Sequence, residues 1–159
     1  SGLLVGADPL AHMLSDSLAS LPFETGGVLL GWREPNAVRI FRALMVPSPD
    51  RGRARYVRSK VAAENAIERA LADEDDPLVG DVGEWHSHPR MSSSSVQDRR
   101  ELRSLSGLAE FPLALIVVAI TKGGMRTRVS GLIFHAGHQL PTTVTILDDT
   151  TRKKGTDDE

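Results

Sequence analysis

The apolar run Leu113–Ile120 (LALIVVAI) constrains the fold more than any other part of this sequence. Its residues do not alternate between apolar and polar, so a strand formed here would be apolar on both faces. Such a strand is stable when both of its faces are covered, which is typical of the inner strands of α/β sheets. We therefore expect this run inside a sheet with helices packed against both sides.

The apolar spacing in the rest of the chain predicts helices that alternate with strands. Three amphipathic helices are expected at 8–20, 59–73 and 95–109, and strands at 26–32, 38–46, 78–88 and 126–134. This order predicts an α/β fold with one domain, in which a mixed β-sheet is flanked by helices. The domain is expected to span 1–138, and an extension at 139–159 is compatible with an edge strand at 142–147. A disordered tail is expected after that strand, because the last residues are almost devoid of apolar side chains.

Composition limits the classes of function. A chain of 159 residues fits one domain, and its net charge of −2 argues against a general nucleic-acid binder. No apolar run approaches the roughly 20 residues that span a bilayer, so no membrane partner is expected. The sequence contains no cysteine, which fits a reducing compartment, and we expect a cytoplasmic protein.

The segment 84–98 (EWHSHPRMSSSSVQD) has the spacing of a metal site. His86 and His88 are two residues apart, so in a strand their rings lie on the same face. Asp98 would supply a third ligand from the following segment. Two imidazoles and a carboxylate suit zinc, and three protein ligands leave a fourth position open for water, as in catalytic zinc sites. We expect one zinc ion per chain.

The motif His-Ser-His-Pro, followed by Ser95 and Asp98, resembles the JAMM (MPN+) motif of zinc-dependent isopeptidases. The resemblance covers about residues 7–135 and includes an upstream glutamate, Glu24, ahead of a glycine-rich apolar strand. It implies the JAMM/MPN fold, which is similar to that of cytidine deaminases. It also implies that Glu24 is the general base and that Ser95 stabilises the oxyanion of the tetrahedral intermediate. In one respect the chain departs from the pattern, because nine residues separate His88 from Asp98 where the family usually has ten.

The resemblance implies a metalloprotease that hydrolyses the amide bond after the C-terminus of a ubiquitin-like β-grasp protein, by deconjugation or precursor processing. The compact chain is more similar to prokaryotic members, some of which belong to anti-phage systems related to ubiquitination. Two alternatives remain: a scaffold of the MPN type without catalytic activity, and a metallopeptidase for small peptides. A DNA-repair protein with a related histidine motif is disfavoured by the upstream glutamate.

Three questions stay open at the level of sequence. Glu84 shares strand parity with the histidines and is therefore a rival to Glu24 as general base. Gly26 and Gly27 either let an extended substrate approach the backbone or serve close packing. The basic segment 51–60 is either a solvated loop or a patch that receives an acidic protein surface.

Overall fold

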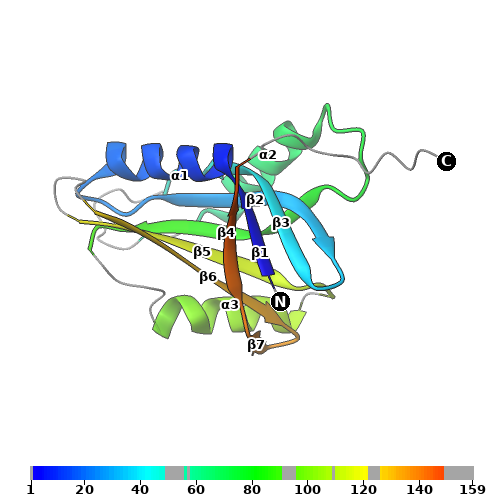
Figure 1. Ribbon diagram of the computed structural model, residues 1–159. Coiled ribbons are helices and arrows are strands. Elements are labelled where there is room, and N and C mark those ends of the chain that lie inside the picture. Colours follow the sequence, from blue (N-terminus) through cyan, green and yellow to red (C-terminus); the bar gives the residue numbers. More distant parts are fainter. Residues whose placement is uncertain are drawn as a thin grey trace.

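The computed structural model describes residues 2–48, 56, 58–90, 96–108, 110–121 and 126–148. These residues form three helices and eight strands (Figure 1). In chain order they are β1 (Gly2–Gly6), α1 (Ala7–Ser20), β2 (Gly26–Glu34), β3 (Ala37–Met45), α2 (Lys60–Leu71), β4 (Gly80–His88), α3 (Val96–Leu108), β5 (Leu113–Ile120), β6 (Thr127–His135), β7 (His138–Leu140) and β8 (Thr143–Leu147).

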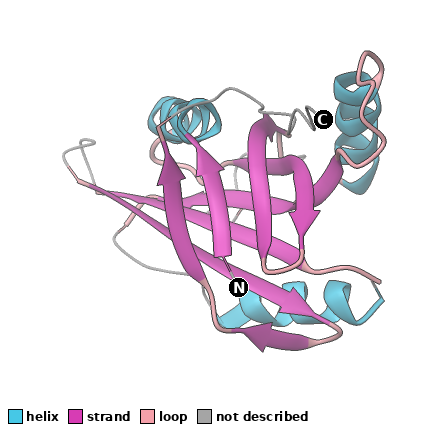
Figure 2. Cartoon of the chain, turned by 45° about the vertical axis from the view of Figure 1, so that its right-hand side comes forward, coloured by secondary structure: helices cyan, strands magenta, loops and turns pink. Residues whose placement is uncertain are grey.

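All eight described strands belong to one sheet, in the order β7-β6-β5-β4-β2-β3-β1-β8 (Figure 2). The sheet is mixed, since β4 pairs with β5 in parallel and with β2 antiparallel. Helices lie on both sides of it. The predicted α/β fold with a mixed sheet flanked by helices is therefore confirmed.

One face of the sheet packs against α1. Met13 of this helix belongs to a buried cluster with Leu29 on β2, Trp85 on β4 and Ile116 on β5. All residues of β5 after Leu113 are buried, which confirms the expectation that this strand is covered on both faces. Trp85 is fully buried in the same cluster, so its side chain faces away from His86 and His88, which follow it in sequence.

The opposite face of the sheet is covered at two separate places. Helix α2 packs over β2 and β3 through a cluster that contains Val28 and Ala63. Helix α3 packs over β5 and β6 through a second cluster, which contains Leu102 and Phe134. Strand β4 lies between β2 and β5 in the sheet, so this face of β4 lies between the two helices. The cleft described below forms along it.

Two of the observed strands were not expected from the sequence. Strand β1 enters the sheet between β3 and β8, and the short β7 pairs with β6. Strand β8 forms one edge of the sheet, within the segment 139–159 that was expected to follow the domain. Within the described parts of the chain, no helix combines the length and apolar character that crossing a bilayer requires.

Candidate metal centre

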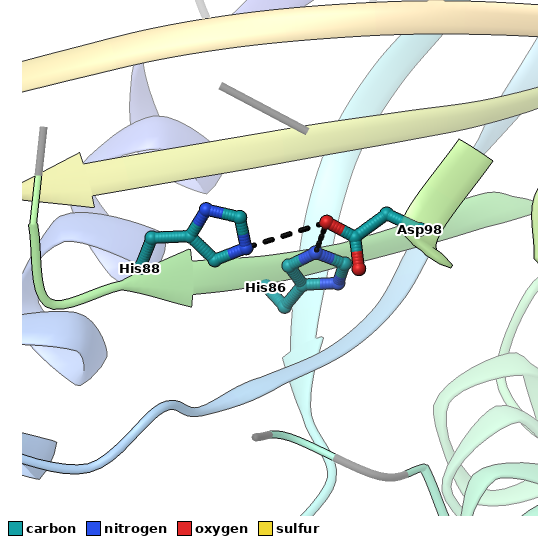
Figure 3. Close-up of side chains that lie close together, drawn as sticks. All are labelled: His86, His88 and Asp98. Carbon is teal, nitrogen blue, oxygen red and sulfur yellow. Dashed lines mark ion pairs between the residues drawn. The ribbon is translucent and has the colours of Figure 1, made fainter. Parts of the chain in front are cut away.

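The structure brings together the three side chains that the sequence suggested as metal ligands (Figure 3). His86 and His88 project from the last residues of β4, and their rings stack with centroids 5.2 Å apart. Asp98 lies in the first turn of α3. Its Oδ2 atom is 3.2 Å from Nε2 of His86 and 3.4 Å from Nε2 of His88. The loop between His88 and Asp98, one residue shorter than usual for a JAMM motif, therefore does not keep the carboxylate away from the two rings.

The donor atoms of this cluster are arranged as a metal ion would need them. One ligand atom from each of the three residues lies within 4.8 Å of the other two, and all three residues are buried. Among the described residues, Nε2 of His86 is a buried polar atom whose contact with Oδ2 of Asp98, at 3.2 Å, is close enough for an ion pair but does not have the geometry of a hydrogen bond. A buried nitrogen that lacks a partner is costly unless something binds it. A cation at the centre of the cluster would satisfy this atom.

The electrostatics of the cluster also favour a positive charge. Burial alone would lower the pKa of His86, but the adjacent Asp98 carboxylate and the charges of Glu84 and Glu24 outweigh burial, so the pKa is raised. A surrounding that favours a protonated imidazole equally favours a metal cation bound to the neutral ring. The carboxylates of Asp98, Glu84 and Glu24 thus create an electrostatic environment at His86 that favours a bound cation.

Glu24 is brought to this site by the pairing of the segment before β2 with the end of β4. The backbone N–H of Ser87 donates to the carbonyl of Thr25 at 2.8 Å, and the N–H of Thr25 donates to Oγ of Ser87 at 2.9 Å. These two bonds hold the chain next to Glu24 against the strand that carries both histidines. The Glu24 carboxylate accepts a hydrogen bond of 2.6 Å from the backbone N–H of Tyr56.

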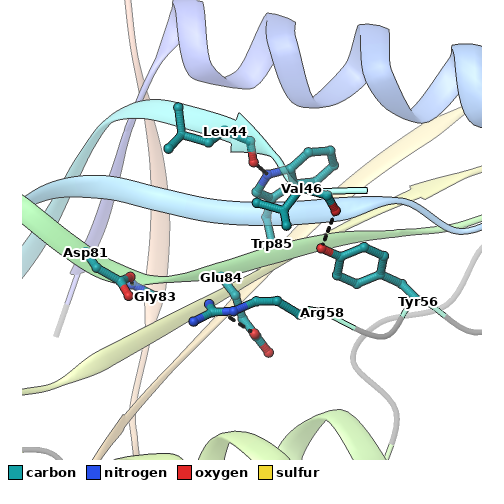
Figure 4. A network of polar contacts seen from close by, with 8 residues as sticks. All are labelled: Leu44, Val46, Tyr56, Arg58, Asp81, Gly83, Glu84 and Trp85. Carbon is teal, nitrogen blue, oxygen red and sulfur yellow. Dashed lines mark hydrogen bonds and ion pairs between the residues drawn. The ribbon is translucent and has the colours of Figure 1, made fainter. Parts of the chain in front are cut away.

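Glu84, the rival base, projects from β4 into the same region (Figure 4). Its Oε2 atom forms an ion pair with Nη1 of Arg58 at 3.6 Å. Burial raises the pKa of Glu84, and the charges of Glu101 and Asp81 add to this, while those of His86 and Arg58 oppose it. The structure therefore brings both candidate bases close to the histidines.

A cleft of about 570 Å³ opens at the candidate metal centre. Its floor is β4, from His86 to Asp81, and its walls come from α2 and α3. Glu64 and Ile67 line the first wall, and Leu105 lines the second. A cleft of this size accommodates a few residues of an extended chain or one long side chain.

Of the remaining candidate residues from the sequence, the structure describes only some. Ser95 and the basic residues 51–55 lie outside the described residues. Arg58, which the sequence grouped with that basic segment, points into the cleft and pairs with Glu84.

The two glycines of β2 are packing glycines in this structure. A Cβ atom on Gly26 would lie 2.4 Å from the carbonyl oxygen of Trp85, and one on Gly27 would lie 1.7 Å from that of Leu44. The neighbouring strands β4 and β3 therefore already occupy the space that an approaching substrate would need.

Sequence reasoning missed the role of Tyr56 and Arg58 at the site. Both were assigned to a basic segment, whereas one contacts Glu24 and the other Glu84. A signal was present, because Tyr56 is the only tyrosine of the chain and the only aromatic residue in this arginine-rich segment.

Comparisons with known proteins agree with this architecture. The model of the family described as prokaryotic homologs of the JAB domain matches residues 7–130. The solution structure of a Desulfitobacterium hafniense protein is similar with a TM-score of 0.66 at 17% identity, and the match covers 92% of this chain and 94% of that chain. A JAB1/MPN domain protein from Archaeoglobus fulgidus matches with a TM-score of 0.49 at 16% identity, over 91% of this chain and 99% of that chain. No curated protein matches the sequence.

The match to the Desulfitobacterium hafniense protein, at 17% identity, is evidence for the fold alone. The family model is stronger evidence, since it spans most of the chain and includes Glu24, Ser95 and all three candidate ligands. It confirms the resemblance that the histidine motif suggested. The chain belongs to the family of prokaryotic homologs of the JAB domain.

Proposed function

We propose that this protein is a zinc-dependent hydrolase of peptide or isopeptide bonds that acts after the C-terminal tail of a ubiquitin-like protein. The observation that carries the proposal is the buried cluster of His86, His88 and Asp98, in which Nε2 of His86 makes no hydrogen bond. Two imidazoles and one carboxylate suit zinc better than magnesium or calcium, which prefer oxygen ligands. Zinc held by three protein ligands would supply a Lewis acid and activate water at neutral pH.

The residues of this chain would handle the proton and the developing charge. Glu24, held beside β4, would accept a proton from the attacking water and pass it to the leaving amine. The water oxygen forms a bond to the carbonyl carbon, and the carbon–nitrogen bond breaks. The hydroxyl of Ser95, at the position that matches the family motif, would donate to the oxyanion of the tetrahedral intermediate.

The cleft and the family support the proposed substrate class. An extended tail fits a narrow cleft along a strand, because it can be recognised largely through its main chain. We propose that the folded β-grasp body adds affinity outside the cleft. A small-peptide metallopeptidase would lack this second contribution, and a scaffold of the MPN type would lack hydrolysis altogether.

Zinc content tests the metal site. We expect about one zinc ion per chain in the purified protein, and loss of this zinc in His86→Ala, His88→Ala and Asp98→Ala variants, as measured by elemental analysis. The control is His138→Ala, which removes an exposed imidazole far from β4 in the sheet order. Full zinc occupancy in a His86→Ala, His88→Ala double variant would exclude the site.

Turnover tests the catalytic roles and the substrate class together. A panel of bacterial β-grasp proteins fused through their C-terminal tails to a reporter protein serves as substrate, beside peptides that carry the tails alone. Glu24→Gln should keep zinc and lower kcat by about 100-fold or more, which is the usual contribution of a general base. Normal turnover by Glu24→Gln together with its loss in Glu84→Gln would reverse the two assignments.

The two kinds of substrate separate the remaining alternatives. Faster cleavage of the folded fusions than of the tail peptides supports recognition of the β-grasp body. Equal rates would indicate a small-peptide metallopeptidase. A zinc-loaded protein that cleaves neither would be a scaffold.

A further inference from the structure

Tyr56 is anchored to the protein at both of its ends. Its backbone N–H donates to Oε2 of Glu24 at 2.6 Å, and its hydroxyl donates to the carbonyl oxygen of Val46, also at 2.6 Å. Figure 4 shows the ring pointing from its own segment toward the end of β3. The side chain is buried, with 8% of its surface exposed.

The ring of Tyr56 packs closely against residues of the sheet. Gly26 leaves the space, because a Cβ atom there would lie 2.9 Å from Cε1 of Tyr56. The ring of His86 lies on another side, with its centroid 6.5 Å from that of Tyr56. The N–H of Val46 donates to the carbonyl of Gly26, so the acceptor of the tyrosine hydroxyl is itself fixed to β2. The place of Tyr56 is therefore set by the same strands that set the metal ligands.

Glu24 needs such an anchor. The hydrogen bonds between Thr25 and Ser87 fix the backbone beside Glu24, but they leave the torsions of its long side chain unrestrained. A general base must lie within hydrogen-bond reach of the water that it deprotonates, and it gains rate from being held there. The N–H of Tyr56 restrains the carboxylate end of the side chain, where this orientation is decided.

We propose that Tyr56 is a positioning residue, which holds the carboxylate of Glu24 in the orientation required beside the metal ligands through its backbone N–H and its hydroxyl anchor on Val46. The inference rests on the proposed function for the role of Glu24. It predicts in addition that a residue outside the family motif contributes to turnover without binding metal.

A spectroscopic experiment tests the contact without any need for turnover. Tyr56 is the only tyrosine in the chain, so labelling with ¹⁵N-tyrosine gives a single backbone amide resonance. In the wild-type protein we expect a downfield amide proton that exchanges slowly with solvent, because it is bonded to a carboxylate. Glu24→Ala should shift this resonance upfield and speed its exchange. Glu64→Ala, which removes a glutamate that lines the cleft, should leave the resonance in place.

A kinetic experiment tests the positioning itself. Tyr56→Phe removes the hydroxyl anchor and should lower kcat about fivefold to tenfold, the usual effect of one hydrogen bond, with zinc content unchanged and KM within about twofold. In a Glu24→Gln background the same change should have no further effect, because there is then no base to position. Ser17→Ala is the control, since it removes a comparable buried bond, to the carbonyl of Met13 in α1, on the other face of the sheet.

The outcomes separate this inference from the function on which it rests. The positioning role would be overturned if Tyr56→Phe had the wild-type kcat, or if Tyr56→Phe lowered kcat equally with Glu24 present and in the Glu24→Gln background. It would also be overturned if the amide resonance of Tyr56 were unchanged in Glu24→Ala. Absence of hydrolysis by the wild-type protein would overturn the proposed function instead, and with it the catalytic meaning of the contact.

Discussion

Asp81 places a carboxyl group at the far end of the cleft floor from the histidines. Burial raises its pKa, although the N–H of Gly83, which donates to Oδ1 at 3.0 Å, and the charges of Arg58 and Arg33 oppose this effect. A carboxyl whose pKa is higher in the folded than in the unfolded chain destabilises the fold once it ionises. The free energy of unfolding should therefore fall as the pH rises above 3.8, the usual pKa of an aspartate, and through the higher pKa of Asp81 in the folded protein.

We predict that Asp81→Asn makes the protein more stable at pH 7. The amide oxygen can still accept the hydrogen bond from Gly83, while the buried charge is gone. The gain should shrink as the pH falls toward 3.8, where the wild-type carboxyl is protonated as well. Urea unfolding of both proteins at pH 7 and pH 4 measures the difference. Asp76→Asn is the matched control, since Asp76 also accepts an N–H two residues further on, and a similar gain there would contradict the explanation.

At the scale of single residues, the sequence was most informative where the residues are close in the chain. The shared face of His86 and His88 follows from strand geometry alone, and the structure agrees. The contact between Glu24 and Tyr56 joins residues 32 positions apart, and it depends on how β2, β3 and β4 pair. The lone aromatic residue marks Tyr56 as unusual, but no local pattern names its partner or that of Arg58, so neither contact could be predicted.

At the scale of elements, an irregularity in β4 sets which of its side chains face the core and which face the cleft. Leu29 of β2 pairs with Gly83 and Leu30 pairs with Asp81, so Val82 is an extra residue on β4 and forms a bulge. Val82 and Trp85 consequently both face the core under α1, although they are three positions apart. Glu84 is turned toward the cleft, on the same face as His86.

Gly83 makes this bulge possible for two reasons. Its φ is +149°, which favours glycine, and a Cβ atom would lie 1.9 Å from the carbonyl oxygen of Ala114 on the paired strand β5. We predict that Gly83→Ala lowers the free energy of unfolding by about 3 kcal/mol or more, because strain and overpacking add. Gly80→Ala in the same strand meets no atom within 4 Å and should be close to neutral. Equal urea midpoints for the two variants would contradict the role of the bulge.

The elements that the sequence predicted are those whose own residues carry a clear period. β5 was recognisable because its apolar run needs cover on both faces, whatever surrounds it. β1 and β7 have five and three residues, too few to establish a period, and they become strands because a neighbouring strand offers its hydrogen bonds. The bulge in β4 could not be predicted either, since it depends on the registry with β2.

At the scale of the whole molecule, the sheet curls until strands far apart in its order meet. A Cβ atom on Gly131 of β6 would lie 2.5 Å from the side chain of Leu3 on β1 and 2.9 Å from that of Val144 on β8. Four strands, β5, β4, β2 and β3, separate β6 from β1 in the sheet order, yet Ile133 of β6 and Leu3 of β1 belong to the same buried cluster. The curl buries Leu3 completely and places β8 over the core shared with α1. The end of the described chain thus closes the core on the side away from the cleft.

The packing of β8 over the core affects where the domain ends. A boundary at 138 would leave out β8, which pairs in parallel with all five residues of β1. We predict that a chain shortened to 1–138 loses about 3 kcal/mol of unfolding free energy, because Leu3 and its neighbours become accessible to water and β1 becomes an edge strand. A chain shortened to 1–148 keeps every described strand and serves as the control. Thermal unfolding of the two chains beside the full-length protein measures the effect, and the zinc content of each shows whether the metal centre, on the other face of the sheet, depends on it. If 1–138 unfolds at the same temperature as the full-length protein, residues 139–159 are a dispensable extension and the core is closed without β8.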